Sequence, residues 1–130
     1  MTDQWDAPDF GLKAVLGFEL QHRDGSACAV LEIGEVHLNP NGVVHGAVPF
    51  TMMDTAMGGA VMNTVADGHA CATIEMQTRY HRPIAEGTLT ATATVTTAGR
   101  RVVHLSAETR DQNDKLIASA TASFAVFEIA

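Results

Sequence analysis

The segment from Gly46 to about Asn63 constrains the fold more than any other part of the chain, because it is apolar around nearly the whole circumference of a predicted helix. Pro49 falls in the first turn of this helix, where its missing N–H costs little. Asp67 and Gly68 mark the return to a loop. A helix without a polar face has to be enclosed, so we expect the rest of the chain to surround it.

Long strands that could enclose the helix are predicted in the second half of the chain. Threonines alternate with apolar residues from Thr88 to Thr96, as in a strand with one buried and one polar face. Gly99 and the segment 111–114 are turn formers, which predicts that the last three strands form an antiparallel meander. The four strands predicted after the helix are 71–80, 88–97, 101–110 and 116–127.

Two further elements are predicted before the helix. Residues 26–35 alternate in the manner of a strand, and a turn signal at 24–25 comes just before them. Residues 9–17 are typical of a short amphipathic helix, with Asp9 as its N-cap and Gly17 at its end.

The lengths of these elements predict one architecture. The long helix spans about 26 Å and the strands reach about 30 Å, so the helix can lie along a sheet. Aromatic residues make up only 5% of the sequence, so the core has to consist mainly of smaller side chains. Such side chains allow the backbones of the helix and the sheet to approach each other closely. We therefore predict a single α+β domain over residues 1–130, in which a curved antiparallel β-sheet wraps a long central helix.

Charge and motif content exclude several classes of function. A formal net charge of −7 repels phosphate backbones, which argues against nucleic acid. No apolar stretch approaches the roughly 20 residues that a bilayer crossing needs, and no leader or C-x-x-C motif is visible, so we expect no membrane partner and a cytoplasmic location. Gly-rich phosphate loops and the G-x-S-x-G elbow of the α/β-hydrolases are also absent from the sequence.

Asp54 is the unusual residue of the apolar helix. Aspartate is a poor helix former and is costly to bury when charged, so its place between Met53 and Thr55 needs a reason. A carboxylate in an apolar cleft is a candidate base or nucleophile, and a structural acid bonded to a nearby loop is the alternative. At the helix start, the free N–H groups near Gly46 and Ala47 form a candidate site for a developing oxyanion.

A longer pattern surrounds these residues. It consists of Asn39-x-x-Gly42-x-x-His45-Gly46-Ala47, then Asp54-Thr55-Ala56-Met57-Gly58, and downstream Thr73 to Pro83, Gly87 and Gly99-Arg100. This pattern resembles that of the hot-dog fold acyl-CoA thioesterases of the phenylacetic-acid-degradation (PaaI) type. The resemblance covers nearly the whole chain from about Leu16 onward. It implies a hot-dog fold and hydrolysis of aroyl-, phenylacetyl- or fatty-acyl-CoA thioesters to free acid and coenzyme A.

The resemblance also implies a role for each matching residue. Asp54 attacks the thioester carbonyl or activates the attacking water, and the Gly46 N–H polarises that carbonyl. Asn39 orients the water or the thioester, Thr73 places a hydroxyl near the same water, and His45 shapes the loop and contacts the thioester. In such enzymes each site combines the Asn39-to-Gly46 loop of one chain with Asp54 and Thr73 of the other, which implies a homodimer and often a homotetramer.

Other candidates for substrate binding rest on position or charge. The His-Gly-Gly motif common in the thioesterases that this pattern resembles is His45-Gly46-Ala47 here. Ala47 keeps the backbone N–H but removes one conformationally permissive glycine. Met53 is a candidate for contact with the acyl group, although methionines in such a helix are more typical of core filling. Half of the basic residues are candidates for binding the phosphates of coenzyme A, with ordinary solvated charge as the alternative: Arg79, Arg82, Arg100 and Arg101.

No metal or cofactor is expected beyond the coenzyme A of the substrate. Five histidines show no metal-like spacing, and we expect each at the surface or satisfied in the core: His22, His37, His69, His81 and His104.

Two other functions stay open on the sequence. The same fold could carry an enoyl-thioester hydratase or dehydratase, but those enzymes pair a catalytic histidine with an acid and only His45 is available as a partner for Asp54. The chain could also be a non-catalytic acyl-CoA binding module with a structural Asp54. Assays of enoyl hydration beside thioester hydrolysis separate the first alternative, and tight binding without turnover would indicate the second.

Overall fold

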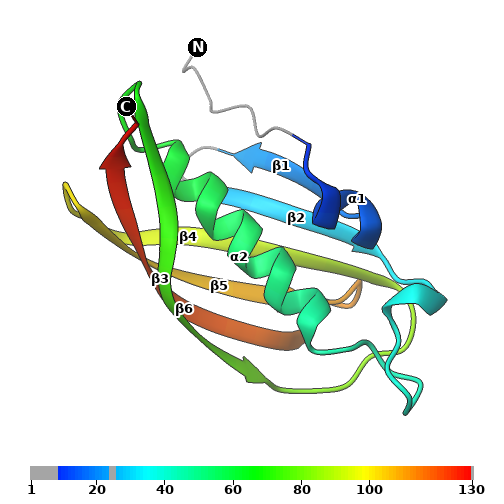
Figure 1. Ribbon diagram of the computed structural model, residues 1–130. Coiled ribbons are helices and arrows are strands. Elements are labelled where there is room, and N and C mark those ends of the chain that lie inside the picture. The colour runs from blue at the N-terminus through cyan, green and yellow to red at the C-terminus, as the bar shows by residue number, and fades with distance from the viewer. Residues whose placement is uncertain (1–8, 24–25, 130) are drawn as a thin grey trace.

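The computed structural model describes residues 9–23 and 26–129. Its elements, in chain order, are α1 (Gly11–Leu16), β1 (Glu19–Arg23), β2 (Ser26–Glu32), the 3₁₀ turn η1 (Glu35–His37), α2 (Ala47–Met62), β3 (His69–Tyr80), β4 (Thr88–Ala98), β5 (Val102–Arg110) and β6 (Leu116–Glu128). The six strands form one antiparallel sheet that curves around α2 (Figure 1). Across the sheet the order is β1-β2-β4-β5-β6-β3, so β1 and β3 are its two edges.

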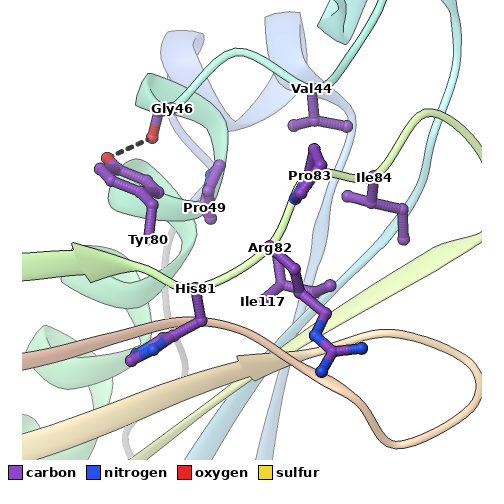
Figure 2. Close-up of a pocket in the computed structure, with 9 residues that line it drawn as sticks. All are labelled: Val44, Gly46, Pro49, Tyr80, His81, Arg82, Pro83, Ile84 and Ile117. Carbon is purple, nitrogen blue, oxygen red and sulfur yellow. Dashed lines mark hydrogen bonds between the residues drawn. The ribbon is translucent and has the colours of Figure 1, made fainter.

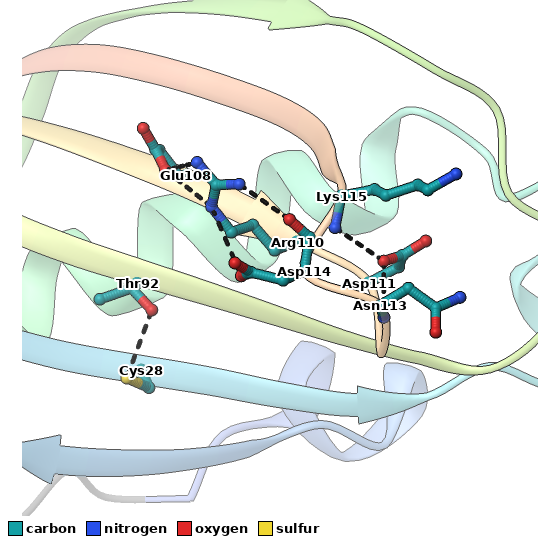
Figure 3. Close-up of polar contacts among 8 residues, drawn as sticks. All are labelled: Cys28, Thr92, Glu108, Arg110, Asp111, Asn113, Asp114 and Lys115. Atoms are coloured by element: carbon teal, nitrogen blue, oxygen red, sulfur yellow. Dashed lines mark hydrogen bonds and ion pairs between the residues drawn. The ribbon is translucent and has the colours of Figure 1, made fainter.

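The predicted architecture of a long helix against a curved antiparallel sheet is confirmed. Strands β4, β5 and β6 form the predicted meander of antiparallel neighbours. Gly99 makes the first turn of the meander, where a Cβ would come within 2.6 Å of the Val102 carbonyl oxygen. Asp111 closes the second turn, because its Oδ1 accepts the backbone N–H groups of Asn113 and Lys115, both at 2.9 Å (Figure 3).

The core lies between the concave face of the sheet and α2. Side chains of β5 alternate strictly between buried and exposed over most of the strand, and those of β4 bury Leu89, Ala91 and Ala93. Small residues dominate the sheet side of the core, as the composition predicts: Ala27, Ala29, Ala91, Ala93, Ala107, Ala120 and Ala122. Because these side chains are short, the helix packs its buried methionines directly onto the sheet.

Strand β1 is not visible in the sequence pattern. It has five residues, lies at a sheet edge and pairs only with β2. Its apolar residue Leu20 is half-buried against the core. A single apolar residue gives no alternating pattern by which the strand could be recognised. The neighbouring β2 ends at Glu32, three residues earlier than predicted, and the predicted turn at 24–25 lies outside the described residues.

Helix α1 forms where it is predicted, but its cap differs. Phe10 is the N-cap, and the Asp9 carboxylate accepts from Lys13 Nζ at 2.9 Å instead of from a backbone N–H. Gly17 ends the helix as predicted, in the left-handed conformation with φ of 82°. No residue of α1 is buried within the chain, so its apolar side chains contribute little to this core.

Helix α2 is not enclosed on all sides, which corrects the expectation drawn from its apolar circumference. The sheet covers one side, and along the other side runs a row of exposed or half-buried residues, the open stripe: Ala47, Phe50, Thr51, Asp54, Thr55, Gly58 and Met62. Next to α2 in Figure 1 lies β3, which among the described residues pairs with β6 alone, so its other edge is unpaired there. Apolar helix surface and an unpaired strand edge are features that another chain commonly covers.

The two cysteines are free thiols. Cys28 is buried, with its Sγ 3.5 Å from Thr92 Oγ1 on the neighbouring strand (Figure 3). No helix within the described ranges is long and apolar enough to span a bilayer. The cytoplasmic location stays a prediction.

Candidate active site

Asp54 and Thr73 are brought together by α2 and β3. The Thr73 hydroxyl donates to Asp54 Oδ1 at 2.7 Å, although 19 positions separate the two residues in sequence. Asp54 is half-buried on the open stripe of α2. Over residues 9–23 and 26–129, no other side chain forms a hydrogen bond or an ion pair with its carboxylate. One carboxylate oxygen is therefore oriented by Thr73, and the second is free for chemistry.

A β-bulge at Ile74 aims Thr73 at the helix. The register of β3 with β6 shifts between Thr73 and Glu75, which makes Ile74 the extra residue. Without the bulge, Thr73 and Glu75 would share one face of the strand. With it, Thr73 faces α2, and Glu75 turns to the outer face and accepts from Ser123 Oγ at 3.1 Å. Bulges are frequent next to active sites because they re-aim a side chain in this way.

The start of α2 leaves one backbone donor free. The Ala47 N–H donates to His45 Nδ1 at 3.0 Å, and the Val48 N–H donates to the His45 carbonyl at 2.9 Å. Pro49 has no N–H to satisfy. Among the described residues, no acceptor contacts the N–H of Gly46. The Gly46 N–H lies at the positive end of the helix dipole and is therefore the donor available to a developing oxyanion.

Two histidines fix the loop before α2, each in one tautomer. His37 is 5% exposed, and its ring accepts the Gly34 N–H at 2.8 Å and donates to the Leu16 carbonyl at 2.6 Å. It is thus a satisfied core histidine, one of the two outcomes predicted. His45 donates its backbone N–H to the His37 carbonyl at 2.8 Å. Because Nδ1 of His45 accepts from Ala47, the exposed ring is left with an Nε2–H donor.

Asn39 closes a turn of the same loop. Its Oδ1 accepts the backbone N–H groups of Asn41 at 2.9 Å and Val43 at 3.3 Å. The side-chain oxygen Oδ1 of Asn39 is therefore occupied by the turn. The side-chain nitrogen Nδ2 is the group left to bind water or a thioester. Its role in orienting either stays a prediction.

Tyr80 holds the Gly46 peptide from the side of β3 (Figure 2). The phenol donates to the Gly46 carbonyl at 2.7 Å, and a Cβ on Gly46 would come within 3.1 Å of the ring. Gly46 has an ordinary φ of −57°, so glycine is needed here for close approach and not for backbone freedom. Partial burial raises the pKa of Tyr80.

The contact between Tyr80 and Gly46 is not predictable from the sequence. The two residues lie 34 positions apart, and no periodicity links them. The available signal is that Tyr80 is the single tyrosine of the chain and stands at the end of a predicted strand.

A cleft of about 440 Å³ opens beside this contact (Figure 2). Gly46, Tyr80 and Arg82 line it together with apolar side chains, of which Pro49 and Ile117 belong to α2 and β6. The cleft thus brings Gly46 and the cation of Arg82 into the lining of one surface.

The four candidate arginines do not form one cluster within a chain. Arg79 and Arg82 lie at the end of β3, whereas Arg100 and Arg101 precede β5 in the β4–β5 hairpin. The pairing of β5 and β3 with β6 sets this hairpin level with the start of β3, so the two pairs are about 20–30 Å apart along the sheet. All four side chains are exposed.

Two predicted substrate contacts, Met53 and Ala47, already contact other parts of the chain, and their roles stay predictions. Met53 is 0% exposed and belongs to the core between α2 and the sheet, so it does not reach the open stripe. The N–H of Ala47 donates to His45 Nδ1 at 3.0 Å.

Gly46 and Asp54 lie too far apart in one chain to act on the same carbonyl group. Eight residues separate them on one helix, which corresponds to about 12 Å along its axis. A reacting group has to approach within about 3–3.5 Å of the carbon that it attacks. A single chain therefore does not complete a site that uses both residues.

The comparison with protein families is decisive for the class of protein. Residues 41–118 match the model of the thioesterase superfamily. The chain belongs to the thioesterase superfamily. The matched range contains the free donor at Gly46, the carboxylate of Asp54, Thr73 and Tyr80. Membership supports hydrolase activity on thioesters, and the predicted hot-dog fold is confirmed.

Three solved structures illustrate the likeness of this thioesterase-superfamily chain to other proteins. PA5202 of Pseudomonas aeruginosa is 32% identical, with 92% of this chain and 95% of that chain covered and a TM-score of 0.86. BH2602 of Bacillus halodurans, whose structure contains CoA, is 30% identical, with 92% and 80% covered and a TM-score of 0.85. A phenylacetic acid degradation-related protein of Ralstonia eutropha JMP134 is 30% identical, with 92% of each chain covered and a TM-score of 0.82.

Proposed function

We propose that this member of the thioesterase superfamily hydrolyses acyl-CoA thioesters in the manner of the PaaI type. The observation that carries the proposal is the half-buried carboxylate of Asp54, oriented by Thr73 at 2.7 Å. A structural acid commonly uses both oxygens to hold its neighbours, whereas Asp54 keeps one oxygen free on the open stripe. The CoA bound in the Bacillus halodurans relative supports this substrate class.

The proposed reaction adds water across the C–S bond of the thioester. The Gly46 N–H donates to the carbonyl oxygen and stabilises the negative charge that develops there. Asp54 either attacks the carbonyl carbon, forming an anhydride that water then hydrolyses, or takes a proton from an attacking water. In both routes the C–S bond breaks, the thiolate of coenzyme A leaves and receives a proton, and the acyl group becomes a free acid. Incorporation of oxygen-18 into the enzyme in a single turnover would indicate the anhydride route.

We propose that two chains share each site. Gly46 and Asp54 are about 12 Å apart on one helix, so a partner chain has to supply one of them. The open stripe of α2 and the free edge of β3 lie side by side and offer the surface for such a partner (Figure 1). Assembly into a tetramer stays a prediction.

We propose Arg82 for the coenzyme A end of the substrate. Arg82 lines the same cleft as Gly46, where the thioester carbonyl is proposed to bind. A guanidinium binds phosphate through two parallel hydrogen bonds, which suits the phosphates of coenzyme A. Arg79, Arg100 and Arg101 stay candidates, and so does the expectation that no further cofactor takes part.

The proposal predicts that the purified chain releases free thiol from acyl-CoA thioesters. A panel of straight-chain acyl-, benzoyl- and phenylacetyl-CoA, assayed with a thiol reagent, measures the activity, and enoyl-CoA hydration is followed in parallel. Turnover of at least one thioester is expected. Hydration without thiol release would favour the hydratase alternative, and tight binding without any turnover would favour the binding module.

Replacing Tyr80 with phenylalanine is expected to lower kcat about tenfold while KM changes little. The substitution removes the hydrogen bond to the Gly46 carbonyl but keeps the ring against the glycine, so the proposed oxyanion donor loses its orientation. Steady-state kinetics on the best acyl-CoA of the panel measures the change. Thr64→Val is the matched control, because it removes another hydroxyl bonded to a carbonyl of α2, that of Val61 at 2.8 Å, outside the open stripe. An equal loss in both variants would contradict the role of Tyr80.

A further inference from the structure

A second cavity, of about 400 Å³, follows the C-terminal half of α2. It is lined by residues of α2, β1 and the start of β3, and by Phe10 and Ile129 near the two ends of the described chain. Most of its wall is hydrocarbon. Its lining includes Thr55, Gly58 and Met62 of α2, and His69 and Cys71 of β3.

The cavity begins at Thr55, the residue that follows Asp54 on α2. Thr55, Gly58 and Met62 continue the open stripe of α2 from Asp54 toward the end of the helix. On the facing strand, Cys71 is two residues before Thr73 and points to the same side, since its thiol contacts the Gly58 carbonyl at 3.8 Å. Burial raises the pKa of Cys71, and the negative charge of Asp54 raises it further, which agrees with their closeness.

Neither packing nor backbone geometry explains the glycine at position 58. A glycine inside a helix is less favourable than an alanine, because it loses more backbone freedom on folding. A Cβ on Gly58 would meet only the Phe124 ring, at an ordinary van der Waals distance of 3.7 Å, so an alanine would fit at this position. The neighbouring Gly59 differs, because its Cβ would come within 3.3 Å of His22. Gly58 lines the cavity, so its missing side chain leaves this space open.

The lining selects by charge and by length. Neither lysine nor arginine occurs among the described lining residues, so a carboxylate placed there would lose hydration without gaining an ion pair to either of these cations. His69 is the one basic side chain of the wall, and its Nδ1 contacts the Asp67 carbonyl at 3.2 Å. From Thr55 to Met62 the wall extends about 10 Å along the helix, a distance comparable with a medium-length alkyl chain.

We propose that this cavity is the acyl pocket of the Asp54 site and accepts uncharged, apolar acyl groups of medium length, with Gly58 keeping it open and Met62 closing its far end. The inference rests on the proposed thioesterase function and names its substrate class. Short acyl groups leave the cavity unfilled, and dicarboxylic acyl groups are rejected.

The test compares kcat/KM over acetyl-, butyryl-, hexanoyl-, octanoyl-, decanoyl- and succinyl-CoA. The wild type should prefer hexanoyl to decanoyl groups over both acetyl and succinyl groups. Gly58→Leu should lower the ratio of octanoyl to acetyl kcat/KM about tenfold or more, because the new side chain fills the cavity. Ala14→Leu adds similar hydrocarbon to the exposed surface of α1 and should leave the ratio unchanged. A ratio that stays the same in Gly58→Leu overturns the proposal.

A second measurement does not depend on turnover. The thioether S-octyl-CoA, which cannot be hydrolysed, should protect Cys71 from alkylation by iodoacetamide at mildly alkaline pH, whereas coenzyme A alone should not. Buried Cys28 is the internal reference for the folded state. Protection without hydrolysis of any thioester would leave the pocket standing and overturn the proposed function. Hydrolysis with a flat chain-length profile and no protection would overturn the pocket and leave the function standing.

Discussion

Replacing Asp54 with asparagine is expected to lower kcat for acyl-CoA hydrolysis about 10²–10⁴-fold, with little change in KM. Asparagine has the same shape, and its amide oxygen can still accept from the Thr73 hydroxyl, which reaches Asp54 Oδ1 at 2.7 Å in the wild type. The amide neither attacks a carbonyl carbon nor takes a proton from water. The chemical step is therefore lost while the pocket is kept. Release of coenzyme A under saturating substrate measures the effect.

Asp67→Asn is the control for the loss of one negative charge. Asp67 is exposed in the loop after α2, so its replacement should leave kcat unchanged. Thermal unfolding of both variants separates catalysis from folding. Full activity in Asp54→Asn would sink the proposed role of the carboxylate. A loss of activity that follows a loss of folded protein would instead identify Asp54 as a structural acid.

The elements that bury a regular row of side chains are predictable from local pattern. Alternation from Thr88 to Thr96 predicts β4, which indeed buries Leu89, Ala91 and Ala93. The apolar run after Gly46 predicts α2 to within a residue or so at each end. Strand β1 escapes prediction because an edge strand of five residues needs little apolar surface. The open stripe of α2 is not predictable from the sequence either. An apolar circumference does not reveal whether the chain's own sheet or another chain covers each side of the helix.

The candidate site is predictable in its residues but not in its contacts. Asp54 stands out because a charge in an apolar helix is costly, and this is visible in one sequence. Thr73 is one of many strand threonines, and its direction depends on a bulge at Ile74 that has no sequence signature. The hydrogen bond from Tyr80 to the Gly46 carbonyl depends on where the end of β3 lies relative to the start of α2. Both contacts are long-range consequences of sheet register, which local pattern does not contain.

Heterodimers that carry two inactivating substitutions, either in different chains or in the same chain, are expected to reveal whether each site uses two chains. Gly46→Pro removes the proposed oxyanion donor, and the φ of −57° at this position suits proline. Gly46→Ala keeps the N–H and is the matched control. Homodimers of Gly46→Pro and of Asp54→Asn should both be almost inactive. A heterodimer with one defect in each chain, isolated through two different affinity tags, should regain about half of the wild-type activity, because one of its two sites receives both intact residues.

A heterodimer with both substitutions in the same chain should give the opposite result. It is the control that shows that activity does not return merely because two different chains are mixed. When one chain carries both substitutions and its partner is wild type, every shared site contains one defect, so activity should stay near zero. A site contained within one chain would reverse both outcomes: the first heterodimer would be inactive and the second would keep about half of its activity. The 12 Å between Gly46 and Asp54 along α2 leads us to expect the shared arrangement. In that arrangement the open stripe of α2 lies at the subunit contact, which gives a reason why so long a helix carries apolar residues on the side that its own sheet leaves uncovered.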